Sequence, residues 1–335
     1  MKRSILSLMY LIQGMRNAGI DIDEKLMRIG LKVDAIDLAS AIDINLEREI
    51  LKVLCSNFSA EQGLKIGQHY TLEGYGPLLM LLISSPYIEI ALHKAIQYCQ
   101  LTHLTGTLNA HVENDQIAIL YQSTRLTDEL DYFLAQCEIA GTFKFLQSLY
   151  QIMDLPFPRI RVELPFELPS NLVEMEFYQQ FYGMDVCFGA PEARFWFSQD
   201  VLKVKIPSFD EVAFRIYEQK CIDELSKLSM YENKPRIVQR VMDYLVLQNS
   251  IMPTMTETAQ VLNMPERTLR HQLQQHQTSY KKIREEIIKN KALEMMEYKK
   301  YSIEMISELL GYSEPAAFNH AFKRWFGQSP RQYLK

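Results

Sequence analysis

Cysteine is scarce in this sequence, with five residues in a chain of 335. The five are Cys55, Cys99, Cys137, Cys187 and Cys221. No two of them lie at the CxxC spacing of common metal and redox sites, and an odd number cannot form a closed set of disulfides. We therefore expect reduced, mostly buried thiols in a cytoplasmic protein.

Long apolar segments are also missing. The longest uninterrupted apolar run covers residues 77–83, whereas a membrane-spanning helix needs roughly 20 residues. The start, MKRSILSLMYLIQG, resembles a secretory leader, but no small-residue cleavage site follows it. Because Ile5, Leu8, Ile12 and Met15 recur at helical spacing, we interpret this segment as an amphipathic first helix and predict no membrane segment.

Motifs of enzymatic catalysis are absent as well. The sequence contains no Gly-rich nucleotide-binding loop, no Ser-centred elbow and no paired metal-ligand motif. His93 and His103 share a predicted helix, but ten positions apart they cannot form an adjacent i, i+4 metal pair. We therefore predict that the protein is not an enzyme and has no cofactor and no metal.

The charge is unevenly distributed along the chain. The whole sequence has a formal net charge of −5. Residues 231–335 contain 16 Lys and Arg against 11 Asp and Glu, a local charge of +5, and the remainder carries −10. A basic tail behind an acidic body favours contact between the tail and a polyanion.

The first two thirds of the chain predict a mixed domain. Apolar residues on a 3–4 period indicate a helix over 43–58, and 128–150 forms a longer one. A further helix follows Ser85, which we interpret as its N-cap, with Pro86 in the first helical position. We therefore expect helices to surround the sheet in this part of the chain.

Strands are indicated by alternating polar and apolar residues. TLNAHVE and QIAILYQ flank Asn114-Asp115, which is typical of a hairpin. RIRVEL (159–164) and ARFWFS (193–198) predict further strands. The fold class is thus an α+β N-terminal domain, with helices around a small antiparallel sheet.

Two stretches of the C-terminal part repeat one pattern. They are TETAQVLNMPERTLRHQLQQ from Thr256 and EMISELLGYSEPAAFNHAFKRW from Glu304. Matching positions share side-chain character, with one extra residue in the second turn: Ala259 with Ser307, Leu262 with Leu310, Asn263 with Gly311, Leu269 with Phe318, His271 with His320, and Leu273 with Phe322. A small residue lets a second helix cross closely, and Asn or Gly tolerates the positive φ of a tight turn. We interpret both copies as helix-turn-helix units.

A single predicted helix, SYKKIREEIIKNKALEMMEY, joins the two units. At ~1.5 Å per residue it is ~28 Å long, which sets the two units about one DNA turn, roughly 34 Å, apart. Thr254 with Glu257 forms a capping-box pattern before the first unit, and Ser302 precedes the second. The C-terminal domain is thus all-α.

A polar segment that ends in a proline separates the two parts. We therefore divide the chain into an N-terminal domain (1–221), a linker (222–235) and a C-terminal domain (236–335).

The end of the chain, GYSEPAAFNHAFKRWFGQSPRQYLK, resembles the signature segment of the AraC/XylS family of bacterial transcription regulators. GYGPLLMLLISSPYIEIALHKAIQYCQ and FYGMDVCFGAPEARFWFS resemble the arabinose-binding-like effector domain of some members. The resemblance implies a sequence-specific regulator, an activator, that binds promoter DNA as a homodimer. It further implies a small-molecule effector, whose identity the sequence does not give, and RNA polymerase as a partner. The resemblance implies effector sensing and dimerisation for residues 1–221 and DNA binding for residues 236–335.

The resemblance assigns the polar positions of each unit's second helix to DNA. Base contacts are implied for Arg267, Arg270, His271, Gln274, Ala316, Asn319, His320 and Lys323, and phosphate contacts for Thr268, Lys282, Arg324 and Arg331. Arg suits a guanine edge and Gln or Asn suits adenine, whereas Ala316 offers only a methyl group. The alternative is an ordinary solvated helix face. Trp325, Phe326 and Tyr333 are expected in the core.

Candidate effector-pocket residues share aromatic or hydrogen-bonding side chains near the 74–77 turn and on the two long helices: Tyr75, Tyr98, His103, Phe133 and Gln136. The alternative for each is ordinary core packing. Two other functions stay open. One is a DNA-tethered enzyme of the alkyl-transfer repair type, for which Cys99 near His103 is the one loose candidate. The other is a ligand-independent DNA-binding adaptor.

Overall fold

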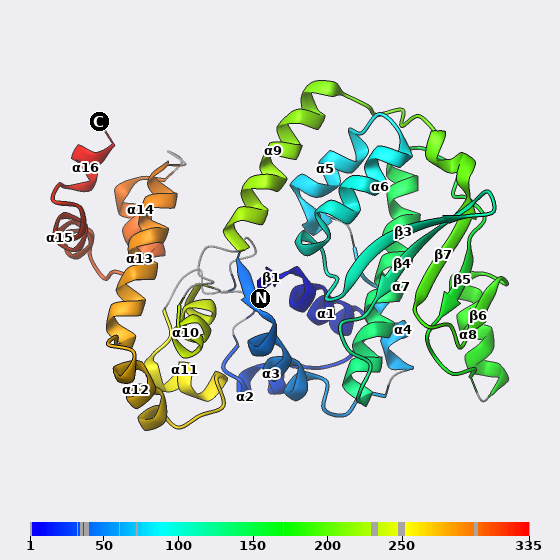
Figure 1. Cartoon of the computed structure of the whole chain (residues 1–335). Helices are drawn as coiled ribbons and strands as arrows, with labels where there is room; N and C mark the ends of the chain where they lie inside the picture. Colours follow the sequence, from blue (N-terminus) through cyan, green and yellow to red (C-terminus); the bar gives the residue numbers. More distant parts are fainter. Residues whose placement is uncertain are drawn as a thin grey trace. The chain divides into compact units, whose positions relative to one another are not determined.

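The computed structural model describes residues 2–31, 33, 36, 40–59, 61–71, 73–169, 171–228, 234–246, 252–297 and 301–334. These residues form two compact units, which we call the sheet unit and the helical unit (Figure 1). The sheet unit contains Arg3–Ile22 and Cys55–Leu228, and the helical unit contains Asp23–Leu54 and the described part of Ser229–Lys335. A segment near the N-terminus thus groups with the C-terminal residues, a feature that the contiguous division of the sequence does not anticipate.

A mixed sheet forms the centre of the sheet unit, with the described strands in the order β3-β4-β7-β5-β6. Their bounds are β3 Thr107–Glu113, β4 Gln116–Gln122, β5 Arg161–Leu164, β6 Val186–Phe188 and β7 Ala193–Ser198. Asn114 and Asp115 close the predicted β3–β4 hairpin with φ of 48° and 60°. The expectation of a wholly antiparallel sheet is wrong at one edge, because β6 pairs parallel with β5. A parallel pair needs a crossover, and helix α8 (Leu172–Tyr182) provides it.

Helices pack around this sheet and against one another in the sheet unit (Figure 1). Besides α8 they are α1 Leu6–Asn17, α4 Gln62–Gly67, α5 Pro77–Ile83, α6 Ile88–Gln97, α7 Glu129–Ile152 and α9 Glu211–Leu228, and a short strand, β1 Lys2–Ser4, precedes α1. The long predicted helix is α7, whose N-cap Asp128 accepts a hydrogen bond from the Asp131 amide at 2.9 Å. Helix α9 includes residues 222–228, so the predicted linker begins inside a helix.

Two details of the helices depart from or extend the sequence-based expectation. Helix α6 begins at Ile88 with Tyr87 as N-cap, so the prediction of Ser85 as the cap is wrong. The Ser85 hydroxyl instead donates to the Leu81 carbonyl at 2.9 Å. Helix α4 approaches α7 closely because Gly63 has no side chain: a Cβ there would lie 2.5 Å from the Phe133 carbonyl oxygen.

The core of the sheet unit lies between α7 and the sheet. Phe143 of α7 stacks on Phe195 of β7 with ring centroids 6.0 Å apart, and it meets Tyr182 of α8 at 5.1 Å. Ile117 and Ile119 of β4 are buried in the same cluster. Full burial of such a side chain stabilises a fold by roughly 1.5–3 kcal/mol. This packing fixes α7, which supplies one wall of the cavity described below.

The helical unit is built mainly from short helices. They are α2 Asp23–Arg28, α3 Ile44–Leu54, α10 Arg236–Val246, α11 Met255–Val261, α12 Glu266–Gln275, α13 Tyr280–Glu297, α14 Ile303–Leu309, α15 Pro315–Phe326 and α16 Pro330–Tyr333, with the short strand β2 Ala41–Asp43. Helix α10 buries Ile237, Val241 and Leu245 on one face, as predicted. The helices of the C-terminal part therefore lie close to where their apolar periodicity places them.

Local capping signals set the ends of these helices. Thr254 and Glu257 form the predicted reciprocal capping box before α11, and the Ser302 hydroxyl accepts a hydrogen bond from the Met305 amide before α14. Asn263 and Gly311 take the positive φ values, 52° and 77°, that the predicted turns require. Helix α12 follows Pro265, which provides no side-chain cap.

The segment Asp23–Leu54 is an integral part of the helical unit. Strand β2 lies against α10, and the buried Tyr244 of α10 donates a hydrogen bond to the Gly30 carbonyl at 3.4 Å. Gly30 adopts a φ of 67° there, which glycine reaches without strain. The C-terminal helices thus pack on residues that come more than 200 positions earlier in the chain.

Candidate nucleic-acid interface and ligand pocket

Helix α12 has one buried face and one exposed polar face. Leu269 and Leu273, spaced i, i+4, are 0% and 1% exposed and hold α12 against its neighbours. The four residues predicted to contact bases on this helix are all exposed: Arg267, Arg270, His271 and Gln274. The structure therefore confirms that their side chains reach solvent, while their contact with DNA stays a prediction.

An ion pair lies along the α12 surface. The Arg270 guanidinium donates to Glu266 Oε1 at 2.5 Å, and the Thr256 hydroxyl of α11 donates to Glu266 Oε2 at 2.7 Å. The hydrogen bond from Thr256, followed by that from Arg270, lowers the pKa of Glu266 below its ordinary value. Because exposed ion pairs contribute little, Arg270 is free to exchange Glu266 for a base edge.

Helix α15 repeats the arrangement with different chemistry. Phe318 and Phe322 are fully buried, and their rings lie 5.7 Å apart. Ala316, His320 and Lys323 are exposed, and Asn319 is half-buried. Among the positions predicted to contact bases, α15 thus has one cation, Lys323, and the methyl group of Ala316, where α12 has two arginines.

A carboxylate on α13 holds the end of α15. Glu285 Oε1 accepts from the Arg324 guanidinium at 2.5 Å and from Trp325 Nε1 at 2.7 Å. These two hydrogen bonds, that from Trp325 first, lower the pKa of Glu285. Arg324, predicted to contact a phosphate, therefore has a partner within the protein, although its side chain is still 68% exposed.

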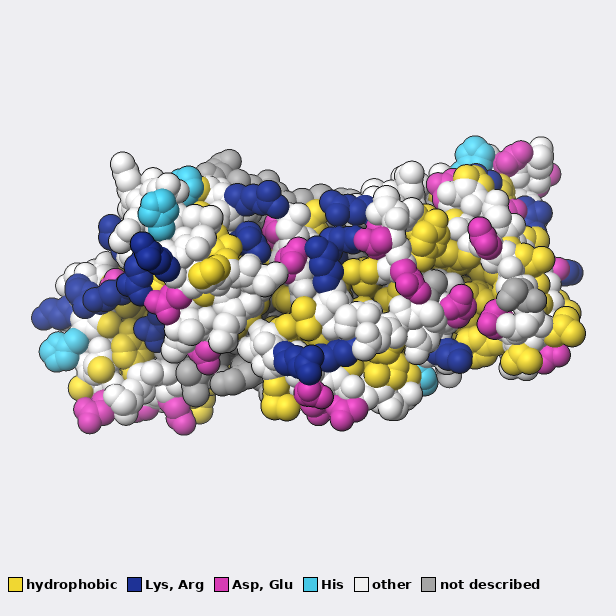
Figure 2. Space-filling view, turned by 90° about the horizontal axis from the view of Figure 1, so that it is seen from below, with side chains coloured by type: hydrophobic (Ala, Val, Ile, Leu, Met, Phe, Trp, Pro, Cys, Tyr) yellow, Lys and Arg dark blue, Asp and Glu magenta, His cyan; other side chains and the backbone are white. Residues whose placement is uncertain are grey.

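The remaining residues of the predicted surface are also accessible. Thr268, Lys282 and Arg331 are exposed. Of the three aromatic residues expected in the core, Trp325 and Phe326 are half-buried, and Tyr333 is 38% exposed. The expectation of burial is therefore wrong for Tyr333 and is met only in part by Trp325 and Phe326. Figure 2 shows Lys, Arg and His side chains gathered at the end of the helical unit that α12 and α15 form.

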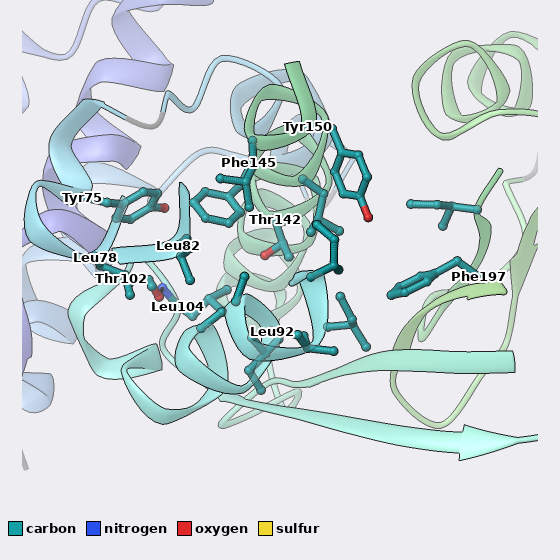
Figure 3. Close-up of a pocket in the computed structure, with 18 of the residues that line it drawn as sticks. Tyr75, Leu78, Leu82, Leu92, Thr102, Leu104, Thr142, Phe145, Tyr150 and Phe197 are labelled. Carbon is teal, nitrogen blue, oxygen red and sulfur yellow. Dashed lines mark hydrogen bonds between the residues drawn. The ribbon is translucent and has the colours of Figure 1, made fainter. Parts of the chain in front are cut away.

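An apolar cavity of about 80 Å³ lies inside the sheet unit, between α5, α6, α7 and the sheet (Figure 3). Most of its lining is aliphatic or aromatic: Leu78, Leu82, Ile88, Ala91, Leu92, Ala95, Leu104, Leu108, Ile119, Phe145, Leu146, Leu149, Pro158, Ile160 and Phe197. Its polar lining residues are Tyr75, Thr102, His103, Thr142 and Tyr150. One water needs roughly 10–15 Å³ of such space, so the cavity is large enough for a small organic molecule.

A hydrogen-bonded chain closes one end of the cavity. The Tyr75 hydroxyl donates to His103 Nδ1, and His103 Nε2 donates to the Glu138 carbonyl at 3.2 Å. The carbonyl assigns the ring proton to Nε2. Burial lowers the pKa of His103 to about 4, against a smaller opposite effect of the Glu138 hydrogen bond. The imidazole is therefore uncharged at neutral pH.

The structure brings two of the five predicted pocket residues together. Tyr75 and His103 line the cavity, whereas Tyr98, Phe133 and Gln136 do not. Phe133 stacks on Phe58 with ring centroids 5.4 Å apart, and Gln136 accepts a hydrogen bond from Tyr178 at 2.7 Å. For these three residues, the alternative of core packing holds.

Sequence reasoning missed most of the α7 wall of the cavity. Thr142, Phe145, Leu146, Leu149 and Tyr150 all line it, and their spacing marks one face of a helix. That spacing could have been used to predict the α7 wall. No comparable pattern predicts the lining residues from β4 and β7, because these strands are far apart in the sequence.

Comparison with known proteins identifies both units. A model of the arabinose-binding domain found N-terminally in AraC transcription regulators matches residues 19–206, more than half of the chain. The chain belongs to the AraC family of transcription regulators. A helix-turn-helix domain model matches residues 258–335. The protein is therefore an AraC-type DNA-binding transcription regulator with an N-terminal ligand-binding domain.

Three relatives illustrate this similarity of the AraC-type chain. It is 25% identical over 277 residues to the uncharacterized HTH-type transcriptional regulator Rv1395 of Mycobacterium tuberculosis, covering 82% of this chain and 78% of that protein. It is 24% identical over 287 residues to the HTH-type transcriptional regulator VqsM of Pseudomonas aeruginosa, covering 84% and 86%. It is 21% identical over 294 residues to the ornithine utilization regulator of Pseudomonas aeruginosa, covering 88% and 84%.

Within the described residues, no helix is both long and apolar enough to cross a membrane. The same residues contain no cluster of three or more His, Cys, Asp or Glu side chains suited to a metal ion.

Proposed function

We propose that this AraC-type regulator reads DNA with two helix-turn-helix units, α11–α12 and α14–α15. The observation that carries the proposal is the duplicated helix pair. Each pair turns at a positive-φ residue, and each second helix buries two side chains spaced i, i+4 while it exposes a polar face. Helix α13 joins the pairs, and its 18 residues span about 27 Å. This length is near the roughly 34 Å repeat of DNA, so α12 and α15 reach successive major grooves of one duplex.

The side chains of α12 supply most of the sequence discrimination in this proposal. Arg267 and Arg270 bind guanine edges, and Gln274 binds adenine, with His271 beside them. In α15, Asn319 and His320 contact bases, Lys323 adds a positive charge, and Ala316 meets a thymine methyl group or none. The phosphate contacts come from Thr268, Lys282, Arg324 and Arg331, which position the helices without reading sequence.

The sheet unit gives this regulator its control. A small-molecule effector binds in the cavity, and its binding changes promoter occupancy and so activates transcription through RNA polymerase. Residues 1–221 act as the sensing and homodimerisation domain, 222–235 as the linker, and 236–335 as the DNA-binding domain. The largely apolar cavity supports this role, because small-molecule sites are concave and mostly apolar.

The alkyl-transfer alternative has little support in the chain. Its candidate, Cys99, is buried, and burial raises the pKa of its thiol to about 11. A thiol with that pKa is almost entirely protonated at neutral pH, whereas the thiolate is the nucleophile. Footprinting on DNA and measurements of ligand binding distinguish the proposed regulator from a ligand-independent adaptor.

Footprinting of the full-length protein on the DNA upstream of its own gene tests the proposal. We expect two protected patches on one face of the duplex, about 10 base pairs apart, for each bound chain. Arg270→Ala should weaken one patch, and His320→Ala should weaken the other. A protein that protects DNA regardless of its sequence, or that gives one short patch unaffected by His320→Ala, contradicts the two-unit proposal.

A further inference from the structure

The cavity of the sheet unit presents no charge to a ligand. Within the described part of the chain, its lining contains no Lys, Arg, Asp or Glu side chain. Its histidine, His103, is uncharged because its pKa lies near 4. Burying an unpaired ionic group in such a site is strongly unfavourable. An ionised ligand group therefore has no compensating partner inside the cavity.

The inner polar groups of the cavity are already engaged within the protein. The Tyr75 hydroxyl donates to His103. The Thr102 hydroxyl donates to the Cys99 carbonyl at 2.6 Å and accepts from the Leu104 amide at 3.1 Å. The Thr142 hydroxyl donates to the Glu138 carbonyl at 2.8 Å. A sugar or polyol placed there would lose its hydrogen bonds to water and find few donors to replace them.

Tyr150 differs from these groups. No hydrogen-bond partner of its hydroxyl is present among the described residues, and burial alone raises its pKa to about 12. Figure 3 shows Tyr75 and Phe197 at opposite sides of the drawn lining, with Tyr150 between them in this view. Tyr150 also lines an adjoining open depression of about 500 Å³, together with the polar Gln147, Gln151 and Asp154. The cavity thus passes from a fully engaged, apolar inner end to an outer end with an available hydroxyl.

We infer that the effector is an uncharged amphiphile: its hydrocarbon part fills the cavity, and its single hydrogen-bonding head group meets Tyr150. This inference deepens the proposed function and rests on it for the link between binding and DNA. It excludes sugars, whose hydroxyls would face the Leu and Ile lining. It also excludes free amino acids and fatty-acid anions, because among the described residues no Lys or Arg lines the cavity or the adjoining depression to pair with a carboxylate.

The first test is binding by the full-length protein. The neutral fluorophore N-phenyl-1-naphthylamine reports occupancy, and 1-decanol, decanoate, decylamine, L-ornithine and L-arabinose compete with it at pH 8. We expect 1-decanol to displace the fluorophore about ten-fold more effectively than either charged chain, and the two polar metabolites to have no effect. Decanoate, decylamine or either polar metabolite competing as well as 1-decanol overturns the inference.

Two pairs of variants locate the binding site. Ala95→Phe narrows the cavity from α6, whereas His93→Phe adds the same ring to an exposed position of the same helix. The first should weaken fluorophore binding about ten-fold or more, and the second should leave it unchanged. If Ala95→Phe does not fold, Ala95→Leu makes the same test with a smaller side chain. Unchanged binding in the folded Ala95 variant overturns the site.

The orientation of the ligand in the cavity is tested by removing one hydroxyl at the outer end and one at the inner end. Tyr150→Phe should weaken the binding of 1-decanol about 3–10-fold, the effect of one net hydrogen bond. It should leave the binding of naphthalene, which has no hydrogen-bonding group, unchanged. Tyr75→Phe should weaken neither to that extent, because its hydroxyl is engaged with His103. The reverse pattern places the head group at the inner end and overturns the orientation.

A DNA readout separates failure of this inference from failure of the proposed function. Specific DNA binding that responds to a polar metabolite, without any binding of 1-decanol, refutes the ligand class and leaves the regulator intact. Binding of 1-decanol to a protein without sequence preference for DNA refutes the proposed function and leaves the ligand class intact. Binding of 1-decanol that shifts specific DNA affinity supports both.

Discussion

Helices α12 and α15 share one design and differ in what they offer to DNA. Each buries a pair of side chains spaced i, i+4 and exposes polar residues on another face. Arg270 of α12 is paired within its own helix, to Glu266, whereas Arg324 of α15 is paired with Glu285 on another helix, α13. The guanidinium of Arg270, whose partner is a residue of the same helix, can turn toward a base. The carboxylate of Glu285 accepts hydrogen bonds from both Arg324 and Trp325, so this contact helps to fix α15 on α13. This difference supports our proposal that α12 discriminates between DNA sequences and that α15 anchors the protein to DNA.

The largest expected effect concerns the buried face of α15. Phe322→Ala removes a fully buried ring that contacts Phe318, Phe326 and Tyr333. We expect the free energy of unfolding of the helical unit to fall by about 3–5 kcal/mol, measured by urea denaturation. Leu273→Ala on α12 should cost a comparable ~2–5 kcal/mol, and the exposed Gln328→Ala should cost almost nothing. A negligible loss at Phe322 would mean that α15 is not held by its aromatic face.

The next effect concerns the discriminating role of α12. Arg270→Ala should weaken binding to the specific site by ~1–3 kcal/mol and leave binding to random DNA nearly unchanged. The measurement is fluorescence anisotropy with specific and scrambled duplexes at one salt concentration.

Arg215→Ala provides a matched control for this variant. Arg215 pairs with Glu211 at i, i+4 and 2.6 Å, almost as Arg270 pairs with Glu266, but it lies on α9 of the sheet unit. The control should bind DNA like the wild type. Equal losses in both variants would attribute the effect to the ion pair rather than to base contact.

A smaller effect is expected on the α15 side. Lys323→Ala should weaken specific and random DNA about equally and reduce the slope of log K against log salt by about 0.9, one phosphate contact. A salt titration of both duplexes measures this slope. Selective loss of the specific site would make α15 a reader of sequence and would remove the contrast with α12.

The smallest effect is the acid sensitivity of the link between α13 and α15. Because the folded-state pKa of Glu285 is lowered, the link stabilises the protein above the ordinary Glu pKa, and that contribution is lost as the pH falls through the lowered value. The ion pair lies at the surface, with 35% of the Glu285 side chain and 68% of the Arg324 side chain exposed, so the contribution is a fraction of about 1 kcal/mol. Glu285→Gln should remove this fraction at pH 7 and narrow the gap to the wild type toward pH 3, as followed by Trp325 fluorescence. A gap that stays constant with pH would show that the charge of Glu285 has no role.

The parts of this molecule that the sequence predicts well depend on short-range signals. The capping box at Thr254, the turns at Asn263 and Gly311, and the apolar stripes of α10 and α12 all follow from residues within a few positions of each other. Glu285 meets Trp325 across 40 positions, and no local pattern announces such a contact. The sequence therefore predicts the polar faces of α12 and α15, but it does not predict the hydrogen bond between Trp325 and Glu285 that distinguishes α15 from α12.

The cavity follows the same rule. Tyr75 and His103 were predictable as polar aromatic groups near a glycine-rich turn, but the wall opposite them is assembled by the sheet from Ile119 and Phe197. The parallel β6 edge was missed because α8 acts as its crossover, and crossover direction is a tertiary property. Tyr98, Phe133 and Gln136 have the right chemistry for a site, but packing directs them elsewhere.

The chain enters the helical unit with Asp23–Leu54, leaves it, and returns after Leu228. If the C-terminal part of this protein were joined to the N-terminal part of a relative at a single junction near residue 230, Tyr244 would face a foreign loop. It would then lose its hydrogen bond to the Gly30 carbonyl. Recombination that preserves function has to carry the early segment and the C-terminal hundred residues together. The unit that contains the C-terminal helices is therefore encoded by separate stretches of the gene.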